Sequence, residues 1–138
     1  MPFLQSCINE TQRMFTVAQA DRVAEKNFEF KGMKIKKGTP VIMSLYGLAH
    51  DETVFPEPEK FLPERERPHD SFTPFGSGPR ACIAQRFALT EIKLVFVSIL
   101  SKYKFVKTSN TFEVPVINKS FFGRSEKPIH LTVVRREY

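Results

Sequence analysis

The chain has 138 residues but no tryptophan, only two cysteines and only six glycines. Two cysteines cannot form the dense disulfide framework of a small secreted domain, and they fit a reducing compartment better. No run approaches the roughly 18 apolar residues of a transmembrane helix, and no secretion-signal pattern opens the chain. Low-complexity repeats are also absent, which excludes a collagen or a disordered tail.

What the sequence does have is size for one domain, 14 phenylalanines and a net charge of +6. Residues 1–69 carry ten basic and ten acidic side chains, so the whole excess lies in residues 70–138. This asymmetry favours an anionic partner such as nucleic acid, a membrane surface or an acidic protein, and a solvated basic surface explains it equally well. The aromatic residues follow core periodicity, which argues against a nucleic-acid-binding module.

Periodicity predicts a mixture of helices and short strands. Apolar residues at helical spacing and a proline near the start predict a helix over residues 2–15. The pattern then alternates, with a hairpin turning at Lys31 and Gly32 between 28–30 and 33–35. A short apolar strand is expected over residues 41–46.

The second half begins with a long irregular segment. Prolines and glycines punctuate residues 50–80, so no regular element can run far, and four phenylalanines there predict a packed loop. Residues 84–103 contain no glycine or proline and predict the longest helix. Alternating residues at 112–116 and 129–133 predict a terminal β hairpin. The fold class expected is α+β, mainly helical with small β-sheets.

Cys82 is the residue most suited to chemistry. It ends the loop 72–82, which holds two glycines and Arg80, and it directly precedes the long helix. The positive end of that helix favours a thiolate, which indicates a nucleophile or a metal ligand rather than a buried structural cysteine. No histidine is placed by spacing to activate a nucleophile, and no Cys or His pair suits zinc. A single axial thiolate on a haem iron needs no partner ligand and fits best.

The segment Phe75-x-x-Gly78-x-Arg80-x-Cys82-x-Ala84 resembles the haem-binding signature of the cytochrome P450 family, with Ala84 in place of the usual glycine. Glu10-x-x-Arg13 resembles the Glu-x-x-Arg motif of that family. Residues 61–65 resemble its Pro-Glu-Arg-Phe element, although Glu66 stands where phenylalanine is usual. The resemblance implies that Glu10, Arg13 and Arg65 form a buried triad supporting the cysteine loop.

The resemblance also assigns roles around a haem b group (iron protoporphyrin IX). Cys82 would be the thiolate ligand of the iron, Phe75 would pack near its sulfur, and Arg22 and Arg80 would hold the propionates. Substrate-contacting positions would be Val17 and Ala18 after the first helix, and Phe121 and Phe122 near the end of the chain. These phenylalanines are equally compatible with plain hairpin packing.

The implied function is that of a haem-thiolate monooxygenase, which inserts one atom of O₂ into a lipophilic substrate and reduces the other to water. NADPH would act only indirectly, through an acidic flavoprotein reductase that docks on the basic proximal face. The basic residues expected to contribute to that face are Arg86, Lys93, Lys102 and Lys104. Microsomal members of the family imply the cytosolic face of the endoplasmic reticulum membrane, reached through an N-terminal anchor that these residues lack.

Residues 1–138 are therefore expected to be part of a haem-binding domain, about the C-terminal quarter of such an enzyme. The oxygen-activating helix would lie upstream of Glu10, and many phenylalanines would face helices outside this sequence. The alternative is a non-catalytic fragment that binds haem weakly or acts only as a basic interaction surface.

Overall fold

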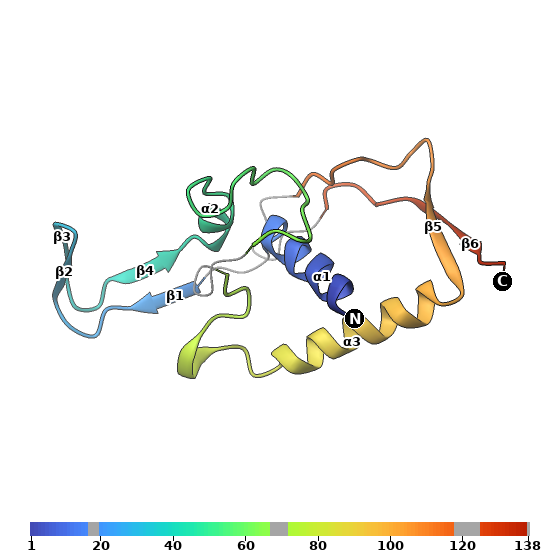
Figure 1. The fold of residues 1–138 in the computed structure, drawn as a ribbon. Coiled ribbons are helices and arrows are strands. Elements are labelled where there is room, and N and C mark those ends of the chain that lie inside the picture. The colour runs from blue at the N-terminus through green and yellow to red at the C-terminus, as the bar shows by residue number, and fades with distance from the viewer. Residues whose placement is uncertain (17–19, 67–71, 118–124, 138) are drawn as a thin grey trace.

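The computed structural model describes residues 1–16, 20–66, 72–117 and 125–137 (Figure 1). Within these ranges there are three α-helices, one short 3₁₀ helix and three two-stranded antiparallel sheets. This arrangement confirms the expected α+β class. No helix in the described ranges is long and apolar enough to cross a membrane.

Helix α1 (Pro2–Met14) confirms the predicted first helix and supplies much of the buried interior. Pro2 lies in its first turn, where the missing N–H group has no intrahelical partner to lose. The helix buries the apolar side chains of Ile8 and Met14 and the charged side chains of Glu10 and Arg13. A helix that buries two charged side chains needs polar partners for them, and the following loop provides these.

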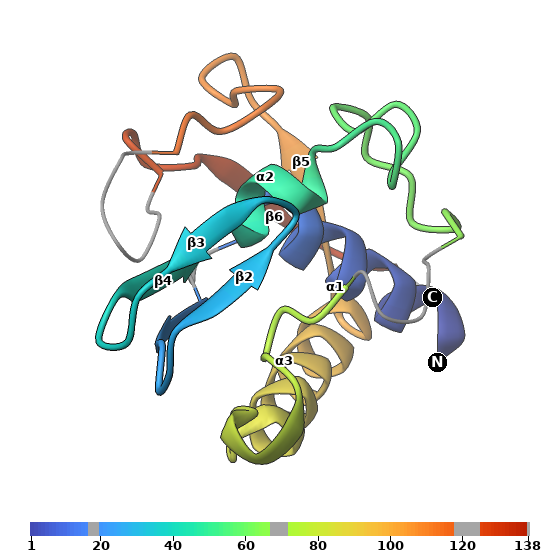
Figure 2. The same ribbon diagram turned by 90° about the vertical axis from the view of Figure 1, so that its left-hand side faces the viewer.

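Four short strands form an arm that extends away from the helices (Figures 1 and 2). Strand β1 (Ala20–Val23) pairs with β4 (Pro40–Met43) in the register Arg22 to Val41. Strands β2 (Phe28–Phe30) and β3 (Met33–Ile35) form the outer hairpin, as the sequence predicts. β1 was not predicted as a strand.

Helix α2 (Leu45–Ala49) corrects the prediction of a strand through residue 46. The side chain of Ser44 accepts a hydrogen bond of 3.0 Å from the Gly47 N–H group, so this residue caps a helix where the apolar run suggested continued strand. The following residues up to 66 contain no helix or strand, which confirms the predicted irregular segment there. Phe55, at its centre, is completely buried, so this part of the loop is packed.

The last elements differ from the prediction in their pairing. Helix α3 (Gln85–Leu100) ends before Tyr103, and Tyr103–Lys107 instead forms β5. Strand β6 (Leu131–Arg135) pairs with β5 and not with residues 112–116, so the predicted terminal hairpin is wrong in its first strand. Pro115 explains part of this result, because it cannot donate a ladder hydrogen bond. Residues 112–117 retain one isolated bridge, from Ile117 to Ser125.

The buried interior is small and lies around α1, α2 and the loop. The buried apolar side chains among the described residues are Ile8, Met14, Ala24, Ala49 and Phe55. By contrast, α3 has no buried residue, and an apolar groove of about 950 Å³ separates its second half from the start of α1. Every described residue of β5 and β6 is also exposed.

Candidate functional site

Cys82 lies in the short connection between the 3₁₀ helix η1 (Gly78–Arg80) and α3, and it is a free, exposed cysteine. Its backbone N–H donates a 2.8 Å hydrogen bond to the Phe75 carbonyl, and its own carbonyl accepts one of 3.3 Å from Gln85 N–H. Both ends of the residue are therefore held. No side chain caps α3, so the first N–H groups of the helix leave a positive potential next to this connection.

Two glycines shape the loop that precedes Cys82. Gly76 and Gly78 have φ values of +74° and +70°, which side chains disfavour. A Cβ atom on Gly76 would lie 3.8 Å from the Ala81 Cα atom, and one on Gly78 would meet nothing within 4 Å. The glycines are thus required by backbone conformation, and the space beside Gly78 is open for a ligand to approach.

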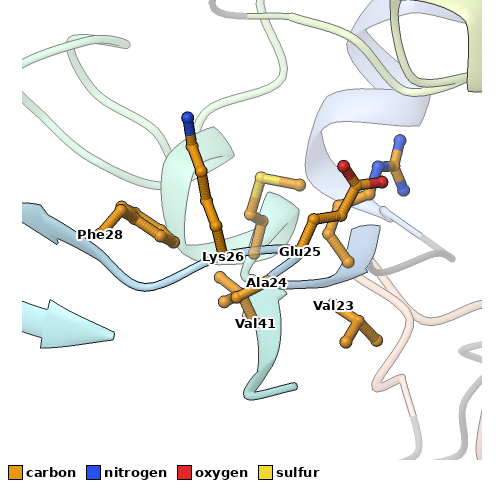
Figure 3. Close-up of a pocket in the computed structure, with 8 residues that line it drawn as sticks. Val23, Ala24, Glu25, Lys26, Phe28 and Val41 are labelled. Atoms are coloured by element: carbon orange, nitrogen blue, oxygen red, sulfur yellow. The ribbon is translucent and has the colours of Figure 1, made fainter. Parts of the chain in front are cut away.

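Of the three other predicted haem contacts, Phe75 and Arg80 belong to this loop and Arg22 lies on the strand arm. Phe75 is half-buried and joins Cys82 through the backbone hydrogen bond, and Arg80 is exposed at the end of η1. Arg22 lies on β1 and lines a shallow hollow of about 320 Å³ on the strand arm, together with Val23 and Val41 (Figure 3). In the ranges that the structure describes, no hydrogen bond or ion pair connects Arg22 to Arg80 or Cys82, so the structure does not by itself join the two arginines into one site.

The predicted triad is present, and it is buried. The Glu10 Oε1 atom accepts hydrogen bonds from Arg13 Nη2 at 3.0 Å and from Arg65 Nε at 3.1 Å. A third bond of 3.1 Å comes from the Leu62 N–H group. The side chains of Glu10 and Arg13 are fully buried, and that of Arg65 is 5% exposed. One carboxylate therefore connects helix α1 with two points of the loop.

The two guanidinium groups also hold the loop through its carbonyl oxygens, which sequence reasoning missed. Arg13 donates to the carbonyls of Ala49 at 2.8 Å, Pro58 at 2.7 Å and Lys60 at 3.3 Å. Arg65 donates to those of Pro56, Glu57 and Lys60, the last two at 2.9 and 3.1 Å. A proline-rich loop has few backbone partners of its own, so these charge-assisted bonds replace the missing ladder.

The ring of Phe55 lies against this cluster, beneath Arg13. The ring is completely buried, and the Arg13 Cζ atom lies 5.7 Å from the ring centroid. The guanidinium group is thus stacked against an aromatic face while its Nη atoms bind carbonyls. The prolines around Phe55 indicated a packed loop, but no sequence signal pointed to Arg13 as its partner.

The electrostatics of Glu10 follow from these contacts. Burial removes solvent and raises the pKa of this carboxyl group, but the hydrogen bonds from Arg13, Leu62 and Arg65 more than offset it, and the net effect lowers the pKa. Glu10 is therefore ionised in the folded protein near neutral pH. Among the described residues, the cluster brings together one negative and two positive groups, and the carbonyl oxygens that the two guanidinium groups bind add further stabilisation.

Glu66 is exposed, so its carboxylate occupies a rim position and not a packed apolar slot. Arg86, Lys102 and Lys104 are exposed, and Lys93 is half-buried. Val17, Ala18, Phe121 and Phe122 lie outside the described residues.

The donor set at Cys82 fits the haem group that the sequence resemblance implies. In the described part of the chain, no group of three or more His, Cys, Asp or Glu side chains gathers as a multi-ligand metal site would require. One exposed thiol, on an anchored loop with open space beside Gly78, would suffice as the single protein ligand of a haem iron. The exposed Ile83 and Phe87 next to it offer apolar surface for a macrocycle.

Comparison with known proteins gives one consistent result. The family model described as Cytochrome P450 matches residues 1–133. Human cytochrome P450 3A7 is 42% identical and human cytochrome P450 3A5 is 39% identical, each over 99% of this chain and 29% of its own length. Dog cytochrome P450 3A12 is 38% identical over the same shares. The chain thus spans a little under a third of the length of these relatives.

Proposed function

This chain belongs to the cytochrome P450 family, and we propose that residues 1–138 supply the thiolate side of a haem-dependent monooxygenase acting on lipophilic compounds. The observation that carries the proposal is Cys82, a free exposed thiol on a loop held by backbone hydrogen bonds and shaped by two left-handed glycines. The proposal refers to a polypeptide of the relatives' length, of which this chain provides one part.

Cys82 would bind the haem iron, and the bound haem would supply the activation of O₂ for insertion of one oxygen atom into substrate. The chain's own contribution is to hold that sulfur in place. The uncapped N-terminus of α3 and the guanidinium group of Arg80, two residues away in sequence, supply positive charge beside this segment. The bond from Cys82 N–H to the Phe75 carbonyl fixes the backbone beside the sulfur, and the half-buried Phe75 ring would pack near it.

Arg22 and Arg80 would bind the two propionates of haem b. A guanidinium group matches a carboxylate with two parallel hydrogen bonds, which lysine cannot reproduce. Arg22 donates to the neighbouring Asp21 carbonyl at 2.6 Å, so its Nη2 and Nε groups remain for a ligand. Arg80 ends η1 with an exposed side chain two residues from Cys82.

The triad would act at one remove from the cofactor, as a positioning device. Glu10, Arg13 and Arg65 fix the loop between α2 and residue 65 to helix α1. We assign to this fixed loop the support of the segment that carries Cys82. The exposed Arg86, Lys102 and Lys104 would receive an acidic flavoprotein reductase that passes electrons from NADPH, at the cytosolic face of the endoplasmic reticulum.

Haem reconstitution of the 138-residue chain tests the proposal. The reduced, carbon monoxide-bound protein is expected to show the absorption maximum of a thiolate-ligated haem, and Cys82→Ser is expected to abolish it. Cys7→Ser is the matched control, because Cys7 is the other free cysteine and lies on α1. Equal spectra for the two variants would reject Cys82 as the ligand. Absence of the maximum in all three proteins would support the alternative function, a basic interaction surface without bound haem.

A further inference from the structure

The β5–β6 pair brings like charges together at the end next to α3. In its register Tyr103 pairs with Arg135. One step further, Lys102 stands opposite Arg136, whose N–H group donates a 2.8 Å hydrogen bond to the Lys102 carbonyl. This bond continues the ladder, so Lys102 and Arg136 lie on the face that carries Lys104. Like charges directly opposite each other destabilise a sheet, and an anion bound between them would relieve the repulsion.

Most of these cations have no carboxylate partner within the described chain. Of the five basic side chains in residues 102–107 and 131–137, only Lys107 forms an ion pair there, with Glu113 at 3.7 Å. The negative end of α3 favours a positive charge at Lys102. Among the described residues, the charges that neither an ion pair nor a helix end explains are those of Lys104, Arg135 and Arg136.

Those three side chains line one hollow. The hollow has a volume of about 460 Å³, and Val134 and Glu137 complete its lining. All five lining residues are exposed, so the hollow is open to solvent. Small-molecule sites in proteins typically enclose about 300–1,000 Å³. A small anion that carries several charges therefore fits this hollow in both size and sign, since three cations outnumber the single carboxylate of Glu137.

Arg136 is oriented before any ligand binds. Its side-chain Nε donates a 3.2 Å hydrogen bond to the Tyr103 carbonyl, and its backbone is fixed by the bond to Lys102. In the described ranges no hydrogen bond uses its two Nη groups. A guanidinium group with free Nη groups binds two oxygens of one phosphate, and a lysine nearby adds a further positive charge.

We propose that this hollow binds a chain of phosphate groups, as carried by a nucleotide or by inorganic polyphosphate. Several cations around one concave site suit a multiply charged anion better than a single carboxylate. An acidic protein explains the hollow less well, because the cores of protein interfaces are depleted in lysine.

The proposed site is separate from Cys82. Helix α3 lies between them and has 16 residues, which corresponds to about 24 Å. Figure 1 shows β5 and β6 beyond the end of α3, on the side of the molecule away from the strand arm. Lys104 is also proposed to face the reductase, but the phosphate site is tested on the chain alone and depends on neither haem nor reductase.

Isothermal titration calorimetry of the full 138-residue chain with sodium tripolyphosphate tests the site. Lys104→Gln with Arg136→Gln is expected to weaken binding at least about a hundredfold, about tenfold for each charge-assisted hydrogen bond lost. Lys34→Gln with Lys36→Gln changes the net charge equally at exposed positions of the strand arm, and less than about a threefold effect is expected. Equal losses in the two double variants would overturn the proposal, because net charge would then explain binding.

A fluorescent reporter locates the contact even if the double variant fails to fold, since the natural chain has no tryptophan. Val134 lines the hollow and is 38% exposed, so tripolyphosphate is expected to change the emission of Val134→Trp. The emission of Val114→Trp, at an exposed site outside the hollow, is expected to stay constant. An unchanged emission of Val134→Trp would overturn the proposal.

Competition experiments identify the ligand class. ATP without added metal is expected to displace tripolyphosphate, whereas adenosine is not. Tighter binding of ATP than of tripolyphosphate would support a nucleotide as the ligand, and equal or weaker binding would support inorganic polyphosphate. Displacement by adenosine, or equally tight binding of polyglutamate, would overturn the proposal, because recognition would then not lie in the phosphate chain.

Discussion

Replacing Glu10 by glutamine removes the carboxylate charge from the buried cluster and keeps the size of the side chain. Among the described residues, Glu10 accepts hydrogen bonds from Arg13, Arg65 and the Leu62 N–H group. In the Glu10→Gln variant two buried guanidinium groups lose their counter-charge, and one amide oxygen must serve three donors. Removing one partner of a buried ion pair costs about 3–5 kcal/mol.

The expected loss of unfolding free energy lies at the lower end of that range, at about 3 kcal/mol, because Arg65 also keeps exposed carbonyl partners. With a urea dependence of about 2 kcal/mol per molar, the midpoint should fall by about 1.5 M. Urea unfolding followed by far-ultraviolet circular dichroism at pH 7 measures the shift. Glu57→Gln is the matched control, since it removes the carboxylate of the exposed Lys60–Glu57 pair and is expected to leave the midpoint in place.

The same variant carries a pH test with a definite sign. The pKa of Glu10 is lowered in the folded state, so between the folded and unfolded pKa values the unfolded chain binds more protons and stability rises with pH. Its contribution is complete above the ordinary value of 4.5 and is lost as the pH falls through the folded pKa. The difference between wild type and Glu10→Gln should therefore narrow below pH 4.5. Equal midpoints for Glu10→Gln and Glu57→Gln at pH 7, or a difference that widens in acid, would refute the argument from burial.

Three further outcomes are expected. Phe55→Ala should lower the unfolding free energy by about 3–5 kcal/mol, because it opens a cavity beneath Arg13. Phe61→Ala, at a site 47% exposed, should lower it much less, and calorimetry measures the unfolding free energy of both variants. Gly76→Ala should cost about 1–2 kcal/mol through its positive φ alone, because the added Cβ finds only ordinary contacts; a cost near zero would show that the loop adopts another conformation. Lys102→Glu should weaken binding to a microsomal flavoprotein reductase most at low salt, and an affinity independent of ionic strength would contradict the proposed basic docking face.

The local sequence pattern was sufficient to predict the elements whose conformation is set by residues close in sequence. Helix α1 and the hairpin of β2 and β3 were predicted because helical spacing and the Lys31-Gly32 turn are short-range signals. The prediction failed where the partner is distant. β5 follows α3 closely, so its first residue, Tyr103, was included in the predicted helix. Its pairing with β6 joins Tyr103 to Arg135 across more than thirty residues.

The candidate site divides in the same way. Cys82, Arg80 and the glycines lie within one short segment, so the sequence alone identified them, and the family resemblance named Glu10, Arg13 and Arg65. Only the tertiary structure showed Phe55 beneath Arg13, and four loop carbonyls and the Ala49 carbonyl of α2 bound to two guanidinium groups. Main-chain carbonyls are the same in every residue and leave no mark in a sequence. The sequence by itself shows few cysteines, no tryptophan and an excess of basic residues. Which of the basic residues lie beside exposed apolar side chains depends on strand register, because register decides which residues share a face.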